Sequence, residues 1–593
     1  MKCRWTMAPP QPLLAGTLAA ALKLPPLLAQ CLVNRNLSEA AAIERFLAPR
    51  LKQLADPFLL PDMARAVERL FVARERGESL VIFGDYDVDG VTSTTLLLEV
   101  LGRLGWHVNA YLPNRMEEGY GLSRDGVENC LKQHAFTLLL AVDCGSTAVE
   151  TVHWLGQSGV DVIVLDHHQV SSPAPKAVAL VNPQMGGGAE CRVSGDGKGA
   201  PPVTGHASPA PRFTELCSAG LAFKLAHAAV KRGREIGLPG AAEFDLRPLL
   251  DLVALGTIAD LVPLTGENRI LVTAGLDRLN TTRRPGLVAL KAVALSPARL
   301  GTHDVGFQLA PRLNAAGRME TAEEALHLLR AESVDEAMPL AQNLDARNRE
   351  RQKIEKTMVD EVIGGVRLKF DAQKDLVIVE GRLLWHIGVV GIVASRVLQE
   401  FYRPTLIIGG ENGEMRGSGR SIAGFDLAAA LRECSDLLVR HGGHALAAGL
   451  SVTPDKIEPL RERLNAIARR HLQPEDLQPP LRLDAEVGLD EINLDSLAVL
   501  DQLKPTGMGN PALQFCARHL THRKPLQRMG AAKQHVKMWI TDGTVTHEAV
   551  WWNAGAGSLP VGKFDLAFAP SLNEFNGRTT VQLKVLDWRA AIS

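Results

Sequence analysis

The sequence predicts an α/β protein that contains a parallel sheet, a second small α/β domain and a β-rich C-terminal part. Three short apolar runs, residues 80–84, 138–142 and 160–165, predict the sheet, because they are rich in aliphatic and β-branched residues and are separated by segments of helix length. Such runs are typical of parallel strands that are buried on both faces. The length of 593 residues, of which 46% are hydrophobic, implies several domains, since single cores rarely grow past roughly 250–300 residues.

Residues 1–62 are expected to form a short helical extension. A serine opens an amphipathic repeat that predicts a helix over residues 37–47. The basic start of the chain and the apolar run at residues 13–21 resemble a signal peptide, but a lysine and two prolines follow at once. No apolar run approaches the ~20 residues that a membrane helix needs. We therefore expect a cytoplasmic protein without a membrane segment.

Residues 63–330 are expected to form the main α/β domain. Within it, residues 184–213 are dominated by Gly, Pro, Ser and Ala, a composition that forbids a packed core and predicts a surface insertion. A fourth apolar run, residues 249–260, ends in Asp260. We interpret it as one more strand that ends in a polar residue.

Residues 331–372 are charged and largely free of Gly and Pro, which predicts a long exposed connecting helix. Two strand patterns at residues 375–380 and 404–409 then flank a helix pattern at residues 392–401. This alternation predicts the second, smaller α/β domain over residues 373–475.

Residues 476–593 change to the alternation of β-strands. The pattern is clearest at residues 535–540 and 579–585, with turn sequences at Asp542-Gly543 and Asn576-Gly577. We expect a β-rich domain at this end of the chain.

The overall charge of the chain does not by itself indicate a nucleic-acid-binding protein. Lys and Arg total 65 and Asp and Glu total 66, so binding of nucleic acid would need a local positive groove. The eight cysteines show no paired C-x-x-C spacing, which argues against a structural zinc site or a disulfide framework.

Clusters of carboxylates and imidazoles directly follow the apolar runs. They are Asp85, Asp87 and Asp89 after the first run, Asp143 after the second, Asp166, His167 and His168 after the third, and Asp260 after the fourth. Because ligands in such sheets bind beyond the carboxyl ends of the strands, these clusters should converge. Carboxylates with a few imidazoles suit Mg²⁺ or Mn²⁺. Two such ions about 3.5–4 Å apart can clamp the attacking and leaving oxygens of a phosphoryl transfer.

A structural interpretation of each aspartate competes with the metal interpretation. A single aspartate at a strand end is more often a turn former or a helix N-cap than a ligand, and Asp85 and Asp166 fit that description. Four clusters with adjacent histidines favour the metal site over four independent turns.

At these residues the chain resembles the DHH phosphoesterase superfamily. Asp166-His167-His168 is similar to its signature triplet, and residues 84–90, Gly-Asp-Tyr-Asp-Val-Asp-Gly, resemble its first motif. Later segments, in order along the chain, resemble the RecJ family of single-strand-specific exonucleases. These segments are residues 113–115, 119–122, 256–260, 311–318, 388–394, 417–421, 442–444 and 447–449. The similarity runs from about residue 13 to about residue 588.

The resemblance implies a fold and a set of metal ligands. The fold is a DHH-type parallel-sheet domain, a connecting helix, a small α/β DHHA1 domain and a C-terminal OB-like β-barrel. The implied ligands of two Mg²⁺ or Mn²⁺ ions are Asp85, Asp87, Asp89, Asp143, His167 and Asp260, with Asp143 bridging the ions. His168 is expected to face the scissile phosphate or the second ion. In a related pyrophosphatase branch a histidine occupies the position of Phe83, so this chain lacks that ligand.

The resemblance also implies residues that hold the 5′ end of a nucleic acid strand. They are Arg115, Tyr120, Arg312, Arg318, His386, Ser418, Arg420 and His444. Glycines around Ser418, Arg420 and His444 would let backbone N–H groups approach phosphate closely. In the β-rich domain, Trp539, Trp551, Trp552 and Phe575 could stack on bases, although aromatic residues in strands usually belong to the core.

The expected function is that of a metal-dependent 5′→3′ exonuclease that degrades single-stranded DNA to nucleoside 5′-monophosphates in recombination and repair. A short-oligonucleotide phosphodiesterase of the same superfamily and a non-catalytic DNA-binding scaffold are the alternatives. The family resemblance suggests single-strand-binding protein and a RecQ-type helicase as partners, and we expect a monomer.

Overall fold

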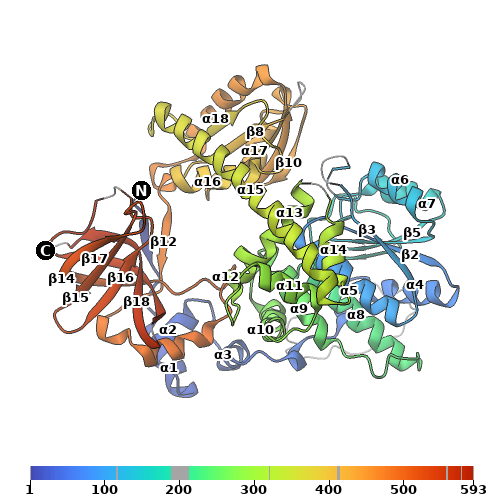
Figure 1. Cartoon of the computed structure of the whole chain (residues 1–593), viewed down its shortest axis with the longest axis horizontal. Coiled ribbons are helices and arrows are strands. Elements are labelled where there is room, and N and C mark those ends of the chain that lie inside the picture. Colours follow the sequence, from blue (N-terminus) through green and yellow to red (C-terminus); the bar gives the residue numbers. More distant parts are fainter. Residues whose placement is uncertain are drawn as a thin grey trace, which may run out of the picture. The chain divides into compact units, whose positions relative to one another are not determined.

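The computed structural model describes residues 2–114, 118–119, 121–187, 213–319, 321–410, 415–555, 558–575 and 577–591 (Figure 1). Arg115, Tyr120 and most of the insertion expected at residues 184–213 lie outside these ranges. The chain divides into two compact units. One comprises residues 48–349 and 505–511, and the other comprises residues 1–47, 350–504 and 512–593.

The first unit is built on a five-stranded sheet in the order β3-β2-β4-β5-β6, in which every pairing is parallel. The strands are β2 (Ser79–Gly84), β3 (His107–Tyr111), β4 (Leu138–Val142), β5 (Asp161–Leu165) and β6 (Ala179–Val181). Gly84 pairs with Val142, and Val142 with Leu165. The three predicted strands therefore end side by side, and the polar clusters that follow them start at one edge of the sheet.

Helices cover both faces of this sheet, which explains why its central strands β2, β4 and β5 are almost entirely apolar and buried. The helices of this unit are α4 (Met63–Glu75), α5 (Val88–Arg103), α6 (Arg124–Gln133), α7 (Val149–Gln157), α8 (Ser218–Glu235), α9 (Leu250–Ala259), α10 (Gly266–Asn280), α11 (Pro285–Val293), α12 (Thr302–Asp304), α13 (Ala310–Met319) and α14 (Glu323–Arg330). Leu80 and Ile82 of β2 lie in one core with α4, α5, α8 and α9, and Val81 and Phe83 lie in a second core with α6 and α7.

The prediction of a strand over residues 249–260 is wrong, because this run forms helix α9. The residues of α9 are buried on every side against α5, α8 and α10, so the run shows neither the alternation of a strand nor the one-sided pattern of a surface helix. Periodicity alone cannot separate a helix of this kind from a buried strand. Asp260 is the C-cap of α9 and still reaches the edge of the sheet.

The expected connecting helix is α15 (Val334–Lys369), a continuous helix of 36 residues with Pro339 in its second turn (Figure 1). The boundary between the two units falls inside it. Met358, Val362 and Val366 of its second half pack against α16 (Val390–Phe401).

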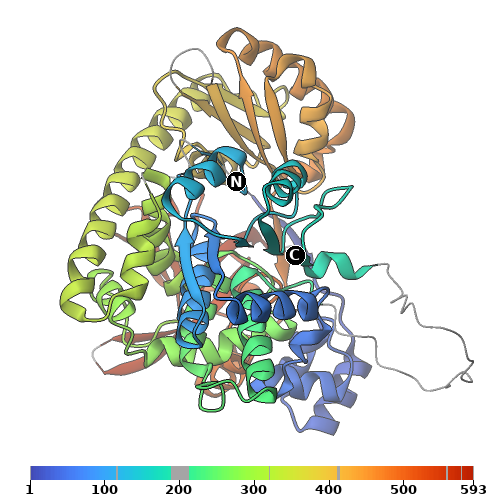
Figure 2. The ribbon, with the colours of Figure 1, turned by 90° about the vertical axis from the view of Figure 1, so that its right-hand side faces the viewer.

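The small α/β domain has a five-stranded sheet in the order β10-β11-β9-β8-β7. Its elements are β7 (Ile378–Gly381), β8 (Thr405–Gly409), β9 (Met415–Arg420), β10 (Arg440–His444), β11 (Ala447–Val452), α17 (Leu427–Arg432) and α18 (Ile457–His471). Only β7 and β8 pair in parallel. Figure 2 shows the sheet at the top, with the orange helices α17 and α18 on one face.

The C-terminal strands close into a ring in the order β13-β14-β15-β16-β18-β17, because β14 also pairs with β17. The strands are β13 (Ala485–Glu486), β14 (Phe515–Met529), β15 (His535–Thr541), β16 (Thr546–Trp551), β17 (Phe564–Phe575) and β18 (Arg578–Ala590). Helix α19 (Leu494–Leu500) packs on the core of this barrel.

The N-terminal residues 4–47 pack with the barrel. Helices α1 (Pro12–Leu22), α2 (Pro26–Val33) and α3 (Ala40–Leu47) share its core, and β1 (Arg4–Met7) pairs with β12 (Pro480–Leu483). Helix α3 begins at Ala40 and not at Leu37, because the N–H of Leu37 donates to the carbonyl of Leu32 and so ends α2.

Among the described helices, none is by itself long and apolar enough to cross a membrane. Helices α1 and α2 would pass such a test only together, and they meet at 119°. Leu28 and Leu32 of α2 are fully buried in the barrel core.

Candidate metal centre and phosphate-binding residues

The loop after β2 is fixed by short contacts at the start of α5. The side chain of Asp87 caps this helix, since its Oδ1 accepts hydrogen bonds from the N–H groups of Asp89 and Gly90 at 2.9 and 3.1 Å. A Cβ atom at Gly90 would lie 2.4 Å from the carbonyl oxygen of Asp85. Only glycine therefore allows the helix to start this close to Asp85.

Helix α13 holds the same loop from the other side. The N–H of Val88 donates to Asn314 Oδ1 at 3.2 Å, and a Cβ at Gly317 would lie 2.7 Å from the carbonyl oxygen of Tyr86. Arg318 follows Gly317 on this helix. Arg312, nearer the start of α13, forms an ion pair with Asp345 of α15 at 2.9 Å.

Two carboxylates meet the first turn of α8. Asp89 accepts hydrogen bonds from the N–H groups of Ser218 and Ala219 at 2.7 and 2.8 Å, and Ser218 Oγ donates to Asp143 Oδ1 at 2.9 Å. Free N–H groups at a helix start favour negative charge there. Asp143 has a φ of 65°, in the left-handed region that side chains rarely adopt. Sequence reasoning missed Ser218, because a serine outside every motif carries no signal.

His167 stands at the centre of the carboxylates. Its Nε2 lies 3.5 Å from Asp143 Oδ1, 3.5 Å from Asp260 Oδ2 and 4.0 Å from Asp89 Oδ2. Burial and then the charge of His168 lower the pKa of His167 to about 4, so the imidazole is neutral at physiological pH. A neutral imidazole is the form that binds a metal ion.

His168 differs from its neighbour in partner and charge. Its Nδ1 lies 2.8 Å from Asp166 Oδ1. Burial would lower its pKa, but the hydrogen bond and charge of Asp166 outweigh burial and raise the pKa of His168 to about 9. His168 is therefore an imidazolium at physiological pH.

Asp166 plays a structural part. Its carboxylate accepts hydrogen bonds from the N–H groups of Ser146, His167 and His168 at 3.0, 2.8 and 3.2 Å. Burial opposes the charged form, but the hydrogen bonds and the charge of His168 hold the pKa of Asp166 well below its ordinary value. This carboxylate orients the histidine pair, in agreement with the structural interpretation of this residue.

The remaining carboxylates repel one another. Burial and then the charge of Asp87 raise the pKa of Asp89 to about 6, and burial with the charges of Asp89 and Asp87 raises the pKa of Asp260 to about 9. Burial and the neighbouring aspartates also raise the pKa of Asp143 well above its ordinary value. Clustered buried carboxylates with so few cationic partners are suited to divalent metal ions.

The donor atoms fit such ions. Within the described residues, three overlapping groups each have ligand atoms within 4.8 Å of one another: Asp143, His167 and His168; Asp89, His167 and Asp260; and Asp85, Asp87 and Asp143. His167 Nε2 and Asp260 Oδ2 are buried and make no hydrogen bond in the described part of the chain. The structure thus brings together every residue that the sequence suggested as a ligand. Phe83 lies in the core beside Tyr111 and contributes nothing polar.

A second group of predicted residues lies in the small α/β domain. Arg420 Nη1 donates to Ser418 Oγ at 3.0 Å, and a Cβ at Gly391 would lie 3.0 Å from Ser418 Oγ and 3.2 Å from Arg420 Nη2. Gly391 is the second residue of α16, so the two side chains lie at the N-terminus of a helix of 12 residues. His386 precedes this helix and accepts a hydrogen bond from the N–H of Gly388.

One face of β9, β11 and β10 carries small residues together with Arg420 and His444. Across the strands, Arg420 is paired with Ala447, and Ala447 with His444. In the neighbouring row across the same three strands, Ser418 is paired with Gly449, and Gly449 with Gly442. Gly442, His444, Ala447 and Gly449 are exposed, and a Cβ at Gly442 would meet nothing within 4 Å. The backbone at Gly442 and Gly449 is therefore accessible on this face, with the basic side chains of Arg420 and His444 beside it.

The aromatic residues of the barrel separate into two kinds. Trp539 points away from the core, because its neighbours Met538 and Ile540 are buried, and the ammonium groups of Lys524 and Lys537 lie 5.4 and 5.9 Å from its ring centroid. Trp552 is 49% exposed, whereas Trp551 packs against the barrel core. The side chain of Phe575 and the predicted site residues Arg115 and Tyr120 lie outside the described residues.

Comparison with known proteins finds matches to three domain families. They are the DHH family, N-terminal domain, over residues 79–257, the DHHA1 domain over residues 374–470, and the RecJ OB domain over residues 483–587. The single-stranded-DNA-specific exonuclease RecJ of Bacillus subtilis (strain 168) is 38% identical over 600 residues, which cover 100% of this chain and 71% of that protein. The chain belongs to the RecJ family.

Other proteins of the RecJ family are similar to this chain in sequence, and two solved structures are similar to it in fold. RecJ of Escherichia coli (strain K12) is 33% identical over 587 residues and 95% of each chain. The crystal structure of RecJ in complex with Mn²⁺ from Thermus thermophilus matches with a TM-score of 0.81 at 29% identity, over 100% of this chain and 80% of that one. The corresponding RecJ complex with Mg²⁺ matches with a TM-score of 0.76 at 27% identity, over 100% and 79% of the two chains.

Membership of the RecJ family confirms the resemblance seen in the sequence and the predicted fold class. The parallel sheet, the connecting helix, the DHHA1 domain and the OB-like barrel are all present. The metal-binding and phosphate-binding roles of single residues stay predictions.

Proposed function

We propose that the chain is a metal-dependent exonuclease that removes nucleoside 5′-monophosphates from single-stranded DNA in the 5′→3′ direction, in recombination and repair. The observation that carries this proposal is the convergence of five carboxylates and two histidines at one edge of the parallel sheet, where three strands and helix α9 end. Its support is membership of a family whose relatives are described as single-stranded-DNA-specific exonucleases and whose solved structures contain Mn²⁺ or Mg²⁺.

The proposed ligands of two divalent ions are Asp85, Asp87, Asp89, Asp143, His167 and Asp260. Bound ions of this kind activate water for attack on a phosphodiester and stabilise the leaving oxygen. Asp143 lies in one donor group with Asp85 and Asp87, and its Oδ1 also lies 3.5 Å from His167 Nε2, which supports the shared position that we assign to it. Ser218 orients Asp143 and Asp89 through its hydroxyl and its N–H.

His168 has a separate role in the proposed mechanism. As an imidazolium held by Asp166, it stabilises negative charge that develops on the scissile phosphate. Its neighbour His167 cannot do this, because its lowered pKa keeps the second proton, and with it the positive charge, off the ring.

We propose that the small domain holds the 5′ end of the strand. Ser418 and Arg420 at the start of α16 offer a hydroxyl, a guanidinium and helix N–H groups to a terminal phosphate. His444 and His386 extend the same surface. Arg318 remains a candidate for contact with the strand, as do Arg115 and Tyr120. Arg312 remains one as well, with part of its guanidinium already bound to Asp345.

The division of labour follows the domains that we assign from the sequence. Residues 63–330 hold the metal centre, residues 331–372 connect, residues 373–475 hold the 5′ end, and residues 476–593 form the OB-like domain. Residues 1–62 form the N-terminal extension, of which residues 1–47 belong to the compact unit of the barrel and residues 48–62 to that of the metal centre. A cytoplasmic location, a monomeric state and contacts with single-strand-binding protein and a RecQ-type helicase complete the proposal.

The experiment is a time course on single strands labelled at the 5′ or the 3′ end, with Mn²⁺, Mg²⁺ or chelator, beside a duplex. We expect metal-dependent release of 5′-labelled mononucleotide from the single strand as the first product. Intact strands that are nevertheless bound would indicate a scaffold. Activity restricted to strands of a few nucleotides would indicate the short-oligonucleotide phosphodiesterase.

A further inference from the structure

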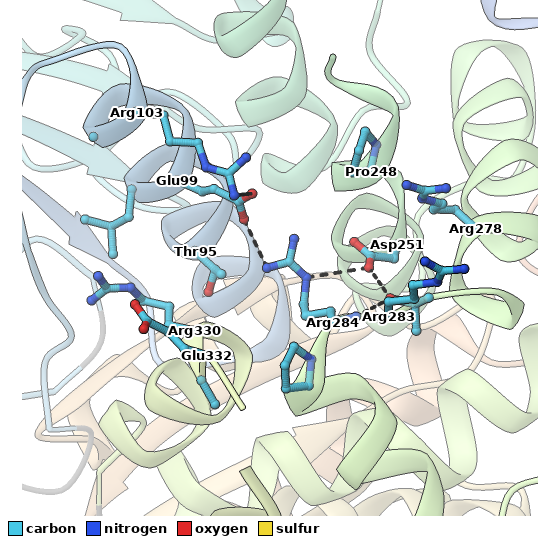
Figure 3. Close-up of a pocket in the computed structure, with 15 residues that line it drawn as sticks. Thr95, Glu99, Arg103, Pro248, Asp251, Arg278, Arg283, Arg284, Arg330 and Glu332 are labelled. Carbon is cyan, nitrogen blue, oxygen red and sulfur yellow. Dashed lines mark hydrogen bonds and ion pairs between the residues drawn. The ribbon is translucent and has the colours of Figure 1, made fainter. Parts of the chain in front are cut away.

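The compact unit that contains the metal cluster, residues 48–349 and 505–511, also has a polar hollow that none of the proposed metal ligands lines. It has a volume of about 700 Å³, within the usual range for sites of small ligands. Five arginines line it: Arg103, Arg278, Arg283, Arg284 and Arg330. Only three carboxylates, those of Glu99, Asp251 and Glu332, oppose them (Figure 3).

The floor of the hollow is an ordered ionic network around Arg284. This guanidinium lies 3.0 Å from Glu99 Oε2 and 3.5 Å from Asp251 Oδ2. Thr282 Oγ1 also donates to Asp251 Oδ2 at 2.7 Å. Asp251 is 2% exposed, and Arg284 Nε is buried without a hydrogen bond in the described part of the chain. A buried network of this kind fixes the floor in one geometry.

Of the four arginines around Arg284, Arg103 is paired with Glu99, since its Nη2 lies 3.2 Å from Glu99 Oε1, and the other three are exposed. Within the described residues, the exposed guanidinium groups of Arg278, Arg283 and Arg330 make no hydrogen bond or ion pair. In Figure 3, Arg330 and Arg103 appear on one side of Arg284, and Arg278 and Arg283 on the other. Arginine forks match the oxygens of phosphate in pairs, so a concave site with unpaired arginines suits a phosphate ester.

We propose that this hollow is a second, non-catalytic site for a phosphate ester of nucleotide size. The phosphate binds to Arg278, Arg283 and Arg330, and Glu332 accepts hydrogen bonds from hydroxyl or amino groups of the same ligand. The ester comes either from a free nucleotide or from the backbone of a strand. The site is separate from the proposed 5′-end site, which lies in the small domain.

The two helices that border the hollow also carry the proposed metal ligands. Helix α5 leads from Asp87 and Asp89 to Glu99 and Arg103, and α9 leads from Asp251 to its C-cap Asp260. At 1.5 Å per residue, these helix lengths place the hollow about 15 Å from the metal cluster. A ligand in the hollow therefore contacts the far ends of the elements that position the metal ligands.

The test measures binding of 5′-dAMP to the full-length Arg420→Ala variant by calorimetry, with chelator present and ionic strength fixed. The Arg420→Ala substitution weakens binding at the proposed 5′-end site, and the chelator removes metal ions that would otherwise bind the phosphate of 5′-dAMP. We expect one 5′-dAMP per chain and no binding of adenosine, which lacks the phosphate. Arg283→Glu and Arg330→Glu should each weaken binding at least tenfold. Both side chains are exposed, so the fold should survive.

Arg299→Glu is the matched control, because Arg299 is exposed in the same unit and lies outside the hollow. It should leave the affinity for 5′-dAMP unchanged. Equal binding in the Arg283→Glu and Arg330→Glu variants, or equal binding of adenosine, would overturn the proposal.

A second arm identifies the source of the ester. Fluorescence anisotropy with a labelled single strand is measured for the same variants in chelator. If strands bind in the hollow, Arg283→Glu with Arg330→Glu lowers strand affinity at least tenfold. If the ligand is a free nucleotide, strand affinity stays unchanged while 5′-dAMP binding is lost. Retention of both would refute the site.

Discussion

Helices α5 and α9 each join two regions of opposite electrostatic character. At one end, Asp87, Asp89 and Asp260 belong to one carboxylate cluster, in which burial and neighbouring charges raise the pKa values of Asp89 and Asp260. At the other end, Glu99 is paired with Arg284 and Arg103, and Asp251 with Arg284. Within the described residues, the exposed guanidinium groups of Arg278, Arg283 and Arg330 make no ion pair. The carboxylate cluster has few cationic partners and is suited to bind metal cations. In the second region the buried carboxylates are paired with arginine, and the exposed arginines around them can bind an anion. The two ends of the same helices therefore suit ligands of opposite charge: cations at the carboxylate cluster, and an anion at the arginines.

The largest expected effect comes from removing one charge at the metal end. Asp143→Asn should lower nuclease activity at least about a thousandfold, because it removes the carboxylate shared by two donor groups. The neutral amide also relieves repulsion, so the metal-free protein should melt at the same temperature or higher. End-labelled strand assays and thermal melting check both results.

Asp245→Asn is the control for this change, since Asp245 is an exposed carboxylate paired with Arg247 in the same unit. It should leave activity unaltered. Wild-type activity in Asp143→Asn would show that this residue binds no essential metal ion.

The next effect concerns the orienting carboxylate. Asp166→Asn should lower the turnover rate about a hundredfold, because His168 loses the partner that keeps it protonated. Activity that depends on the imidazolium should fall above about pH 9 in the parent and at lower pH in the variant. A pH profile of kcat at saturating Mn²⁺ measures the shift. An unmoved alkaline limb would exclude a role for the charge of His168.

A smaller effect is expected in the small domain. Arg420→Ala should weaken binding of a 5′-phosphorylated single strand about tenfold, in the range of one lost charge-assisted hydrogen bond. Binding of the same strand with a 5′-hydroxyl should change less. Arg432→Ala on α17 removes an exposed arginine elsewhere in this domain and serves as the matched control. Equal losses for both strands would argue against a phosphate-specific contact.

The smallest effect is on stability and pH. The folded-state pKa of Asp260 is raised from 3.8 to about 9 and that of His168 from 6.5 to about 9. Folding therefore retains protons that the unfolded chain has lost, and the metal-free protein should lose stability as pH rises from about 7 to about 9. Thermal melts should show this decline with chelator and a smaller one with Mn²⁺. A melting temperature that rises over this range without metal would contradict the assigned charges.

The sequence was sufficient to predict the sheet and its polar edge, because buried parallel strands are continuous apolar runs and their ends must meet. It could not separate α9 from a strand, since a helix buried on all sides has no periodic pattern. Asp260 was nevertheless assigned correctly to the cluster, because the end of α9 and the ends of the strands reach the same edge.

Other features needed the structure. Ser218 and Asn314 act through a hydroxyl, an amide and backbone N–H groups, which leave no distinctive spacing in a sequence. The partner of Arg312 on α15 lies 33 residues away, and only folding brings Asp345 to it. The arginine hollow is assembled from α5, the region around α9 and α10, and the end of α14, so no single segment announces it.

The most direct test of the central claim is a crystal soaked in Mn²⁺ and measured at the manganese absorption edge. We expect two anomalous peaks, about 3.5–4 Å apart, with Asp143 between them and His167 bound to one. A single peak, or peaks that avoid Asp143, would contradict the two-metal centre that we propose at the carboxyl ends of the strands.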